Sequence, residues 1–454
     1  MTYPQHIRAL LVLGLPLIGS HLAQFAVHVV DTIMLGWYDL TALAASVLAT
    51  SFFFVVFIMG SGFAFAVMPM VAEAAEKDDA MRIRRVTRMG MWLSVIYAAV
   101  FLPAMIWSGA LLQLAGQTEE LSALAQDYLR IAGFGLFPSL LVMVLKSYLA
   151  SMERTQVVLW VTVAAIGVNA GLNWLLIFGN GGFPEMGLRG AALASVLTQV
   201  LTLAALGLYA TQVDGLRDHA LFQRIWRPDT GALDEVFRLG WPIGLTNLAE
   251  SGMFSASALI IGLIGKLPLA AHGIALQITS ATFMIHIGLS QAVTVRAGRA
   301  VGRGDMAGLG RGGMAGVGLS LGIVGLTMIA FLGVPELLIK GFIAPDEPNR
   351  EVILTIGASL LAVAALFQLV DAGQVMALGV LRGIQDTRVP MIMAAFSYWV
   401  MGIPASYILG ITLGYGGVGV WMGLVIGLLF ATVLLWWRFL RRFREMSAGV
   451  AQGG

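Results

Sequence analysis

Twelve long apolar runs constrain the fold of this chain more than any other feature of its sequence. Each provides the ~20 residues that an α-helix needs to cross a hydrocarbon core of ~30 Å. None alternates as a membrane β-strand would, so helices are the expected elements. With 58% hydrophobic and 11% charged residues, the chain is excluded from the water-soluble class, in which roughly 25% of residues are charged. The runs lie near residues 9–35, 41–72, 89–113, 122–149, 155–179, 187–212, 234–263, 268–298, 312–335, 352–381, 388–413 and 417–440.

Basic residues gather in every second connecting segment. If the N-terminus is cytoplasmic, the cytoplasmic segments hold all of the 27 Lys and Arg residues except Arg130, Arg189, Lys266, Lys340 and Arg350. This asymmetry predicts that both termini are cytoplasmic. The first apolar run is too long for the core of a signal peptide, so we interpret it as the first of the membrane helices.

Composition and motifs also exclude several functions. The net charge is only +2 and the basic residues are scattered, which argues against a nucleic-acid partner. The absence of cysteine excludes disulfides and thiolate metal sites. The glycine-rich stretch 308–313 lacks the Lys-Ser/Thr of a phosphate-binding loop, and no clustered Ser, His and Asp set indicates hydrolysis. We therefore expect neither an ATP-driven pump nor an enzyme, and no cofactor.

The chain contains an internal repeat, which appears when it is shifted by 226 residues against itself. The shift pairs the segment LGLP, ending at Pro16, with LGWP, ending at Pro242, and it pairs Asp79 with Asp305. Because six helices separate the copies, both halves enter the membrane in the same direction as parallel repeats. The predicted divisions are an N-terminal lobe at 1–211, a cytoplasmic linker at 212–233 and a C-terminal lobe at 234–454.

Three carboxylates fall inside the predicted helices: Asp31, Glu250 and Asp371. An ionisable group at this depth costs about 2.5–3.5 kcal/mol or more, so it usually faces a cavity and marks an ion or substrate path. The repeat places neutral residues opposite all three, so the scaffold is duplicated and the charges are not. Carboxylate and amide oxygens suit Na⁺, and a buried carboxylate can equally take H⁺.

Polar and aromatic residues accompany these acids at helical spacing. Asn169 and Asn173 lie one turn apart on helix 5, and Gln368, Asp371 and Gln374 share one broad side of helix 10. Such groups can also serve only as hydrogen bonds between helices. The residues predicted to line a substrate cavity are Gln24, His28, Asn247, Gln277, His286, Phe367 and Gln368.

Two segments carry a family resemblance. Gly14-Leu15-Pro16 followed by Val-Asp-Thr-Ile-Met-Leu-Gly at 30–36, and Gln-Leu-Val-Asp at 368–371 followed by Leu-Arg-Gly-Ile-Gln-Asp-Thr-Arg at 381–388, are similar to signatures of the MATE (multidrug and toxic compound extrusion) family and its NorM-like branch. The resemblance covers essentially the whole chain. It implies an all-α integral membrane protein with two six-helix lobes in a V, working as a monomer in the lipid of the bacterial inner membrane. It also implies alternating access and export of organic cations or drugs in exchange for Na⁺ or H⁺.

The resemblance also assigns sites. It implies that Glu250 and Asp371 form a cation site, which would hold Na⁺ in a sodium-coupled protein, and that Asp31, Asn169 and Asn173 form a polar site in the N-terminal lobe. The acidic pair favours Na⁺. Sodium-binding relatives can have Tyr where this chain has Phe367, and other relatives can have Asp at the position of Asn173, so both coupling ions stay open.

A flippase for lipid-linked saccharides, from the same superfamily, is the alternative function; it would need several Arg or Lys in its cavity, whereas the charges within these helices are mainly acidic.

In the segment between helices 10 and 11, Asp386 or Thr387 is expected to cap helix 11.

Overall fold

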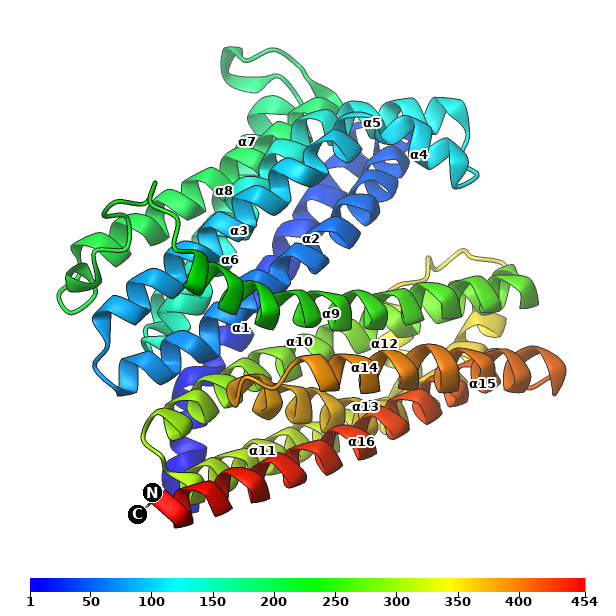
Figure 1. Cartoon of the computed structure of the whole chain (residues 1–454). Helices are drawn as coiled ribbons and strands as arrows, with labels where there is room; N and C mark the ends of the chain where they lie inside the picture. Colours follow the sequence, from blue (N-terminus) through cyan, green and yellow to red (C-terminus); the bar gives the residue numbers. More distant parts are fainter. Residues whose placement is uncertain (454) are drawn as a thin grey trace. The chain divides into compact units, whose positions relative to one another are not determined.

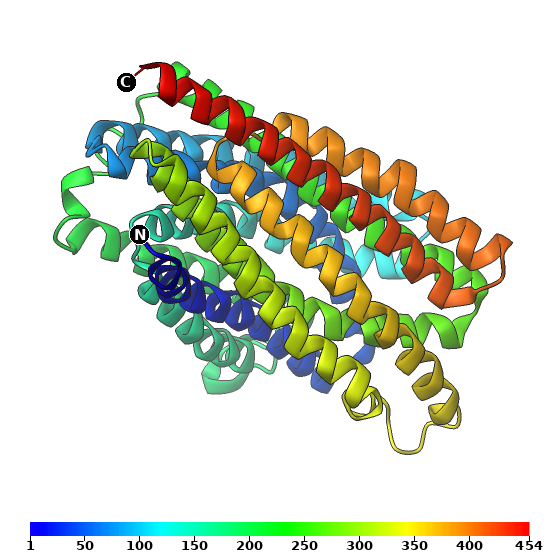
Figure 2. The same cartoon turned by 90° about the horizontal axis from the view of Figure 1, so that it is seen from below.

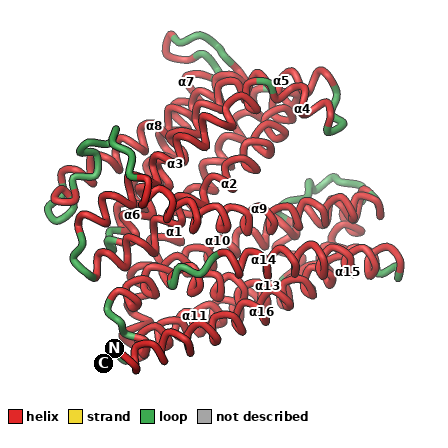
Figure 3. Tube along the Cα trace, in the orientation of Figure 1, coloured by secondary structure: helices red, strands yellow, loops and turns green. Residues whose placement is uncertain are grey.

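The computed structural model describes residues 1–453, and side chains up to Ala448. Every regular element in this range is a helix (Figure 3). Twelve helices in the described range are long and apolar enough to cross a membrane, which confirms the predicted fold class and number of spans. The spans are α1 (Tyr3–Tyr38), α2 (Leu40–Glu76), α3 (Ala80–Ile106), α5 (Glu119–Ala132) with η1 (Gly133–Gly135) and α6 (Leu136–Ser151), α7 (Thr155–Leu176), α8 (Gly187–Gln212), α9 (Thr230–Ile264), α10 (Lys266–Gly302), α11 (Met306–Gly333), α13 (Arg350–Gly383), α14 (Arg388–Phe396) with η4 (Ser397–Gly402), α15 (Ile403–Tyr407) and η5 (Ile408–Thr412), and α16 (Gly416–Gly453).

The remaining elements are short. They are α4 (Ser108–Leu114), η2 (Asn180–Gly182), η3 (Arg217–His219) and α12 (Pro335–Lys340).

Equivalent helices of the two repeats begin in the same way. Asp79 caps α3 by accepting a hydrogen bond from the backbone N–H of Arg82 at 2.9 Å, and Asp305 caps α11 by accepting one from Gly308 at 2.7 Å. A side-chain oxygen at this position satisfies an N–H group that would otherwise lack a partner. The repeat that pairs Asp79 with Asp305 in the sequence therefore preserves a structural role.

The contacts within the chain define two compact units. The first consists of Gly19–Gly244, and the second of Met1–Ile18 together with Leu245–Gly454. The boundary between the units falls after Ile18 in α1 and after Gly244 in α9, and the 226-residue shift pairs these two residues. Each boundary lies two residues beyond a proline inside its helix, Pro16 in α1 and Pro242 in α9. The predicted lobe boundaries follow the order of helices along the chain, and they stay a prediction.

Glycine permits the same close approach in each unit. In the first unit, a Cβ on Gly62 would collide with the backbone of Gly240 and Gly244; in the second, a Cβ on Gly288 would lie 2.7 Å from the backbone nitrogen of Ile18. Gly288 is the repeat equivalent of Gly62, and Ile18 that of Gly244. The start of each repeat's first helix thus packs on the second helix of the other repeat, where only a residue without a side chain fits.

The first unit is a bundle in which α2 packs on α3, α5 and α6, and α6 packs on α8, which in turn contacts α7 (Figure 1). Its core is apolar, with Val67, Met89, Leu145 and Leu149 almost entirely buried. In the second unit α13 is central, because it contacts α10, α11 and α16 (Figure 2). Polar side chains on the buried faces of α13, such as those of Asp371 and Gln374, are therefore enclosed by neighbouring helices.

Residues 213–229, between α8 and α9, dock onto α3 within the first unit. Arg84 Nε donates to the carbonyl oxygen of His219 at 2.5 Å, and Trp92 Nε1 donates to that of Ile225 at 2.7 Å. Arg85 forms an ion pair with Asp229. This linker is held by side chains of a membrane helix and has little regular structure of its own.

The segment between α13 and α14 corrects one expectation. Asp386 does not cap the following helix; its Oδ2 accepts a hydrogen bond from Arg438 Nε of α16 at 2.7 Å, with Arg442 Nε at 3.6 Å. Thr387 occupies the cap position of α14 and makes no capping bond with its side chain. The local sequence pattern predicts a capping bond, but the carboxylate instead forms an ion pair with Arg438, which lies 52 residues further along the chain.

Candidate functional site

A polar cluster lies within the first unit around Asp31 of α1. Asn173 Nδ2 donates to Asp31 Oδ1 at 2.6 Å, Ser195 Oγ donates to Asp31 Oδ2 at 3.2 Å, and Asn173 Nδ2 also contacts Asn169 Oδ1 at 3.1 Å. The predicted residues Asp31, Asn169 and Asn173 are thus brought together. Ser195 of α8 completes the cluster; sequence analysis missed it because a single Ser in an apolar helix gives no distinguishing signal.

This cluster can accept a further polar group. Asn169 and Asn173 are fully buried, and Asn173 Oδ1 and Asn169 Nδ2 have no hydrogen-bond partner among the described residues. Buried polar atoms usually have partners, so an acceptor and a donor left open beside a carboxylate suit a ligand or an exchangeable proton. Of the other helix-1 candidates, Gln24 is half-buried and His28 is exposed.

A second cluster lies within the second unit, where α9, α13 and η4 meet. Gln374 Nε2 donates to Glu250 Oε1 at 2.7 Å, and the hydroxyl of Tyr398 donates to Gln374 Oε1. Gln374 and Tyr398 are fully buried. These two hydrogen bonds fix the orientation of the Gln374 amide, because its nitrogen donates to the carboxylate and its oxygen accepts from the phenol. Gln374 shares a helix side with Asp371 in the sequence, but nothing in the sequence marks Tyr398.

Asp371 is the most deeply buried acid of this second cluster. It is 3% exposed, and its Oδ1 has no hydrogen-bond partner among the described residues. Gln374, which donates to Glu250, lies one helical turn beyond Asp371 on α13, so both carboxylates belong to the same cluster. Two like charges in a medium of low dielectric are stabilised when a cation or proton is shared between them. The residues present, two carboxylates with an amide and a phenol beside them, fit a small hard cation.

Tyr398 is placed by an irregular segment of helix. η4 is a π-helix, and such segments are rare and frequent at functional sites. The next residue of η4 is Trp399, whose Nε1 donates to the carbonyl oxygen of Ala249 at 3.0 Å, next to Glu250. The segment thus fixes both the hydroxyl beside Gln374 and the backbone of α9 beside Glu250.

A partly buried cation lies beside the same cluster. Arg382 Nη2 of α13 donates to Asn247 Oδ1 of α9 at 2.8 Å. Asn247 precedes Glu250 by one helical turn. In the sequence, Arg382 is one of the basic residues that mark the cytoplasmic side, and no pattern there places it near Glu250.

The remaining cavity candidates of the second unit have mixed surroundings. Phe367 is 4% exposed, with its ring 5.4 Å from that of Trp421. Gln368 accepts a hydrogen bond from Thr327 at 2.8 Å, and His286, which is 1% exposed, contacts Ser320 Oγ at 3.0 Å. Gln277 is exposed. Packing and interhelical hydrogen bonds account for Phe367, Gln368 and His286, and a role in substrate contact stays a prediction for all of these residues.

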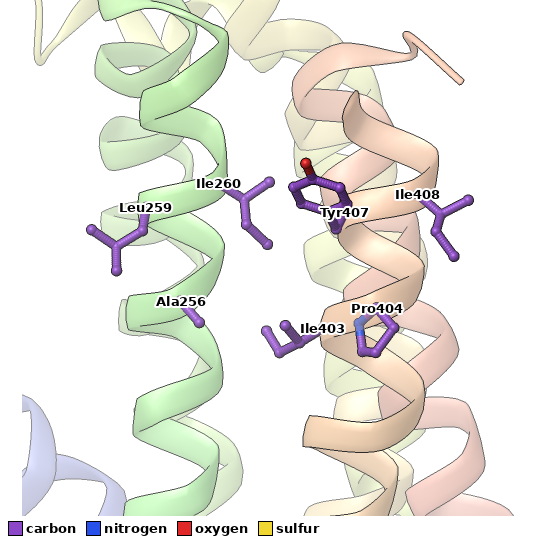
Figure 4. A pocket seen from close by; sticks show the side chains of 7 residues that line it. All are labelled: Ala256, Leu259, Ile260, Ile403, Pro404, Tyr407 and Ile408. Atoms are coloured by element: carbon purple, nitrogen blue, oxygen red, sulfur yellow. The ribbon is translucent and has the colours of Figure 1, made fainter. Parts of the chain in front are cut away.

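An apolar groove of about 470 Å³ lies along α9 beyond Glu250. Figure 4 shows Ala256 and Ile260 of α9 facing Ile403 and Tyr407 of α15. Ala256 follows Glu250 by fewer than two turns of the helix. The helix that carries the acid thus also forms one wall of an apolar surface.

Comparisons with known proteins identify relatives along the whole chain. The family described as MatE matches residues 16–175 and again 242–408, so the two matches begin at the prolines that the repeat pairs. A probable multidrug resistance protein NorM of Rhizobium meliloti is 44% identical over 450 residues, which cover 99% of this chain and 96% of the relative. Multidrug resistance protein NorM of Burkholderia vietnamiensis is 35% identical over 94% of this chain and 92% of its own length.

Solved structures share the fold. The eukaryotic MATE transporter AtDTX14 has a TM-score of 0.85 at 19% identity, with 99% of both chains covered. A MOP superfamily transporter from Pyrococcus furiosus has a TM-score of 0.84 at 22% identity, with 97% of both chains covered. At these identities the likeness concerns the fold alone.

Proposed function

The chain belongs to the MatE family, and on that premise we propose that it is a secondary active multidrug exporter of the bacterial inner membrane. It exports organic cations by antiport with Na⁺ or H⁺, by alternating access, and works as a monomer with both termini in the cytoplasm. The names of the relatives, multidrug resistance proteins, support the substrate class.

The observation that carries the proposal is the pair Glu250 and Asp371. One acid is held by Gln374 and the other is buried with an oxygen left without a hydrogen bond. A coupling cation relieves the repulsion between them, so its binding is favoured by their combined negative charge. In another step of the transport cycle, an organic cation is exchanged for the coupling cation, so one positive charge replaces another.

Na⁺ is the coupling ion that the donor set favours. The cluster offers carboxylate, amide and phenol oxygens within one unit, and hard cations select oxygen ligands. The same acids would carry the proton in an H⁺-coupled protein. We do not propose the flippase, since the relatives are named for drug resistance and both clusters are centred on acids.

Efflux of a fluorescent organic cation from proteoliposomes, with Na⁺ and pH gradients imposed separately, tests the proposal. We expect Glu250→Gln and Asp371→Asn to abolish gradient-driven efflux, because each removes a charge that binds the driving cation. The control is Glu351→Gln, an exposed acid in the first turn of the same helix as Asp371, and it should transport normally. Gradient-driven efflux at the unmodified rate in both site variants would reject the site.

A further inference from the structure

Arg382 brings a permanent positive charge to the Glu250 cluster. It lies on α13, three helical turns beyond Asp371, and reaches α9 through the hydrogen bond from Nη2 to Asn247 Oδ1 at 2.8 Å. Arginine keeps its charge in proteins at any physiological pH. A guanidinium inside a bundle is costly unless an opposite charge and hydrogen bonds compensate it.

The compensating charge is Glu250. It lies one helical turn beyond Asn247, whose side chain accepts the hydrogen bond from Arg382. Asp371 lies three helical turns from Arg382 on α13, and its Oδ1 has no hydrogen-bond partner among the described residues. The cluster thus consists of one acid with a resident counter-charge and one acid without.

We propose that Arg382 is a positioning residue that neutralises one of the two acids, so that the site carries one net negative charge and binds one monovalent cation. The inference rests on the proposed function and adds the number of coupling ions to it. Asn247 holds the guanidinium one turn from Glu250, and Gln374 holds Glu250 from the opposite side. Asp371 Oδ1, which has no hydrogen-bond partner among the described residues, is left for the incoming ion.

Counting the bound ions tests the proposal. Equilibrium binding of radioactive Na⁺ to the purified full chain in detergent should give one ion per chain. In Arg382→Gln, which keeps a donor for Asn247 but removes the charge, we expect Na⁺ to bind at least about tenfold more tightly and a second monovalent cation or a Ca²⁺ ion to bind. Arg382→Lys keeps the charge and should still bind one Na⁺. The matched control is Arg350→Gln, which removes the same charge from the opposite end of α13.

The outcomes separate this inference from the function on which it rests. Two ions per wild-type chain, or an unchanged count and affinity in folded Arg382→Gln, would overturn the inference and leave the antiport proposal standing. If Arg382→Gln does not fold, the wild type and Arg382→Lys decide: one ion in both supports the inference, and two overturn it. If Na⁺ does not bind, the protons released on adding a fluorescent organic cation are counted by the same criteria. Neither ion bound would reject the proposed site and the inference with it.

Discussion

Ser20 of α1 and Thr162 of α7 lie 3.1 Å apart, at the same sequence separation of 142 residues as Asp31 and Asn173. The equal separations mean that the two helices run parallel and in constant register for three turns. The Asp31 cluster is therefore one end of a continuous seam. Lys146 Nζ contacts Ser20 Oγ at 3.5 Å at the other end, so the seam has a basic and an acidic terminus.

We expect the acidic end to be functional. Asp31→Asn keeps the shape of the side chain and removes its charge, so an organic cation should bind more weakly and the transport cycle should stop. Asn173 can still donate to the amide oxygen and the Ser195 hydroxyl can accept from the amide nitrogen, so the melting temperature should change little. Parallel measurement of efflux and melting temperature in detergent checks this. Normal efflux per folded molecule together with a lower melting temperature would make Asp31 structural.

The basic end of the seam is expected to be structural. Thr162 Oγ1 donates to the carbonyl oxygen of Val158 at 2.7 Å, so Ser20 is the donor in the contact between the two hydroxyls. Ser20→Ala removes this bond and the partner of Lys146, and we expect it to lower the free energy of unfolding by about 1 kcal/mol. Efflux should persist. Loss of efflux without loss of stability would instead extend the functional site to Ser20.

Much of this architecture could be predicted from the sequence, because long apolar runs identify membrane helices and an internal repeat shows the same pattern of residues twice. The acids Asp31, Glu250 and Asp371 were recognisable because charge is rare at that depth. Ser195 and Tyr398 were not, since their residue types are common in helices and only packing brings them to the acids.

Arg382 shows a different limit. Its position near a helix end made it a topology signal, and the sequence contains no indication of how far the side chain extends. The hydrogen bond to Asn247 places its charge in the site. The same limit explains Asp386, whose distant partner Arg438 could not be predicted from the local pattern.

The ion pair of Asp386 should stabilise the second unit. The side chains of Asp386 and Arg438 are 9% and 19% exposed, so the pair is partly buried, and removing one partner leaves a charge with poor solvation. We expect Asp386→Asn to cost about 1–3 kcal/mol in thermal or chemical unfolding. Asp127→Asn, in an exposed pair with Arg189, is the control and should cost well under 1 kcal/mol. Equal costs would show that burial does not distinguish the two pairs.

The predicted topology can be tested in a chain that contains no cysteine. Single cysteines at Leu40, which is 75% exposed, and at Lys77, just after α2, occupy opposite ends of one helix. With cytoplasmic termini, a membrane-impermeant thiol reagent added outside whole cells should label position 40 and not position 77. The reverse labelling pattern would invert the orientation, and labelling of both after cell lysis serves as the control for accessibility.

The last prediction concerns pH and the linker. His219 is 7% exposed, and burial lowers its pKa, with the nearby Arg84 acting in the same direction and Asp218 opposing. Its Nδ1 lies 2.7 Å from the hydroxyl of Tyr148. Because the docked linker disfavours the protonated ring, a released linker binds the proton more readily, and its pKa returns to about 6.5. Docking is therefore at full strength above that value and weakens as the pH falls through it.

Hydrogen exchange of residues 213–229 should accordingly be faster at pH 5.5 than at pH 7.5, after correction for the intrinsic exchange rate. His219→Gln, which cannot take up the proton, should remove most of this difference. Asp229→Asn tests the alternative that the Arg85 ion pair is responsible: this hydrogen bond lowers the pKa of Asp229, so its contribution is lost only below the ordinary carboxyl range, and the variant should keep the difference between pH 5.5 and 7.5. A linker whose corrected exchange is the same at both pH values in the wild type would refute the role of His219.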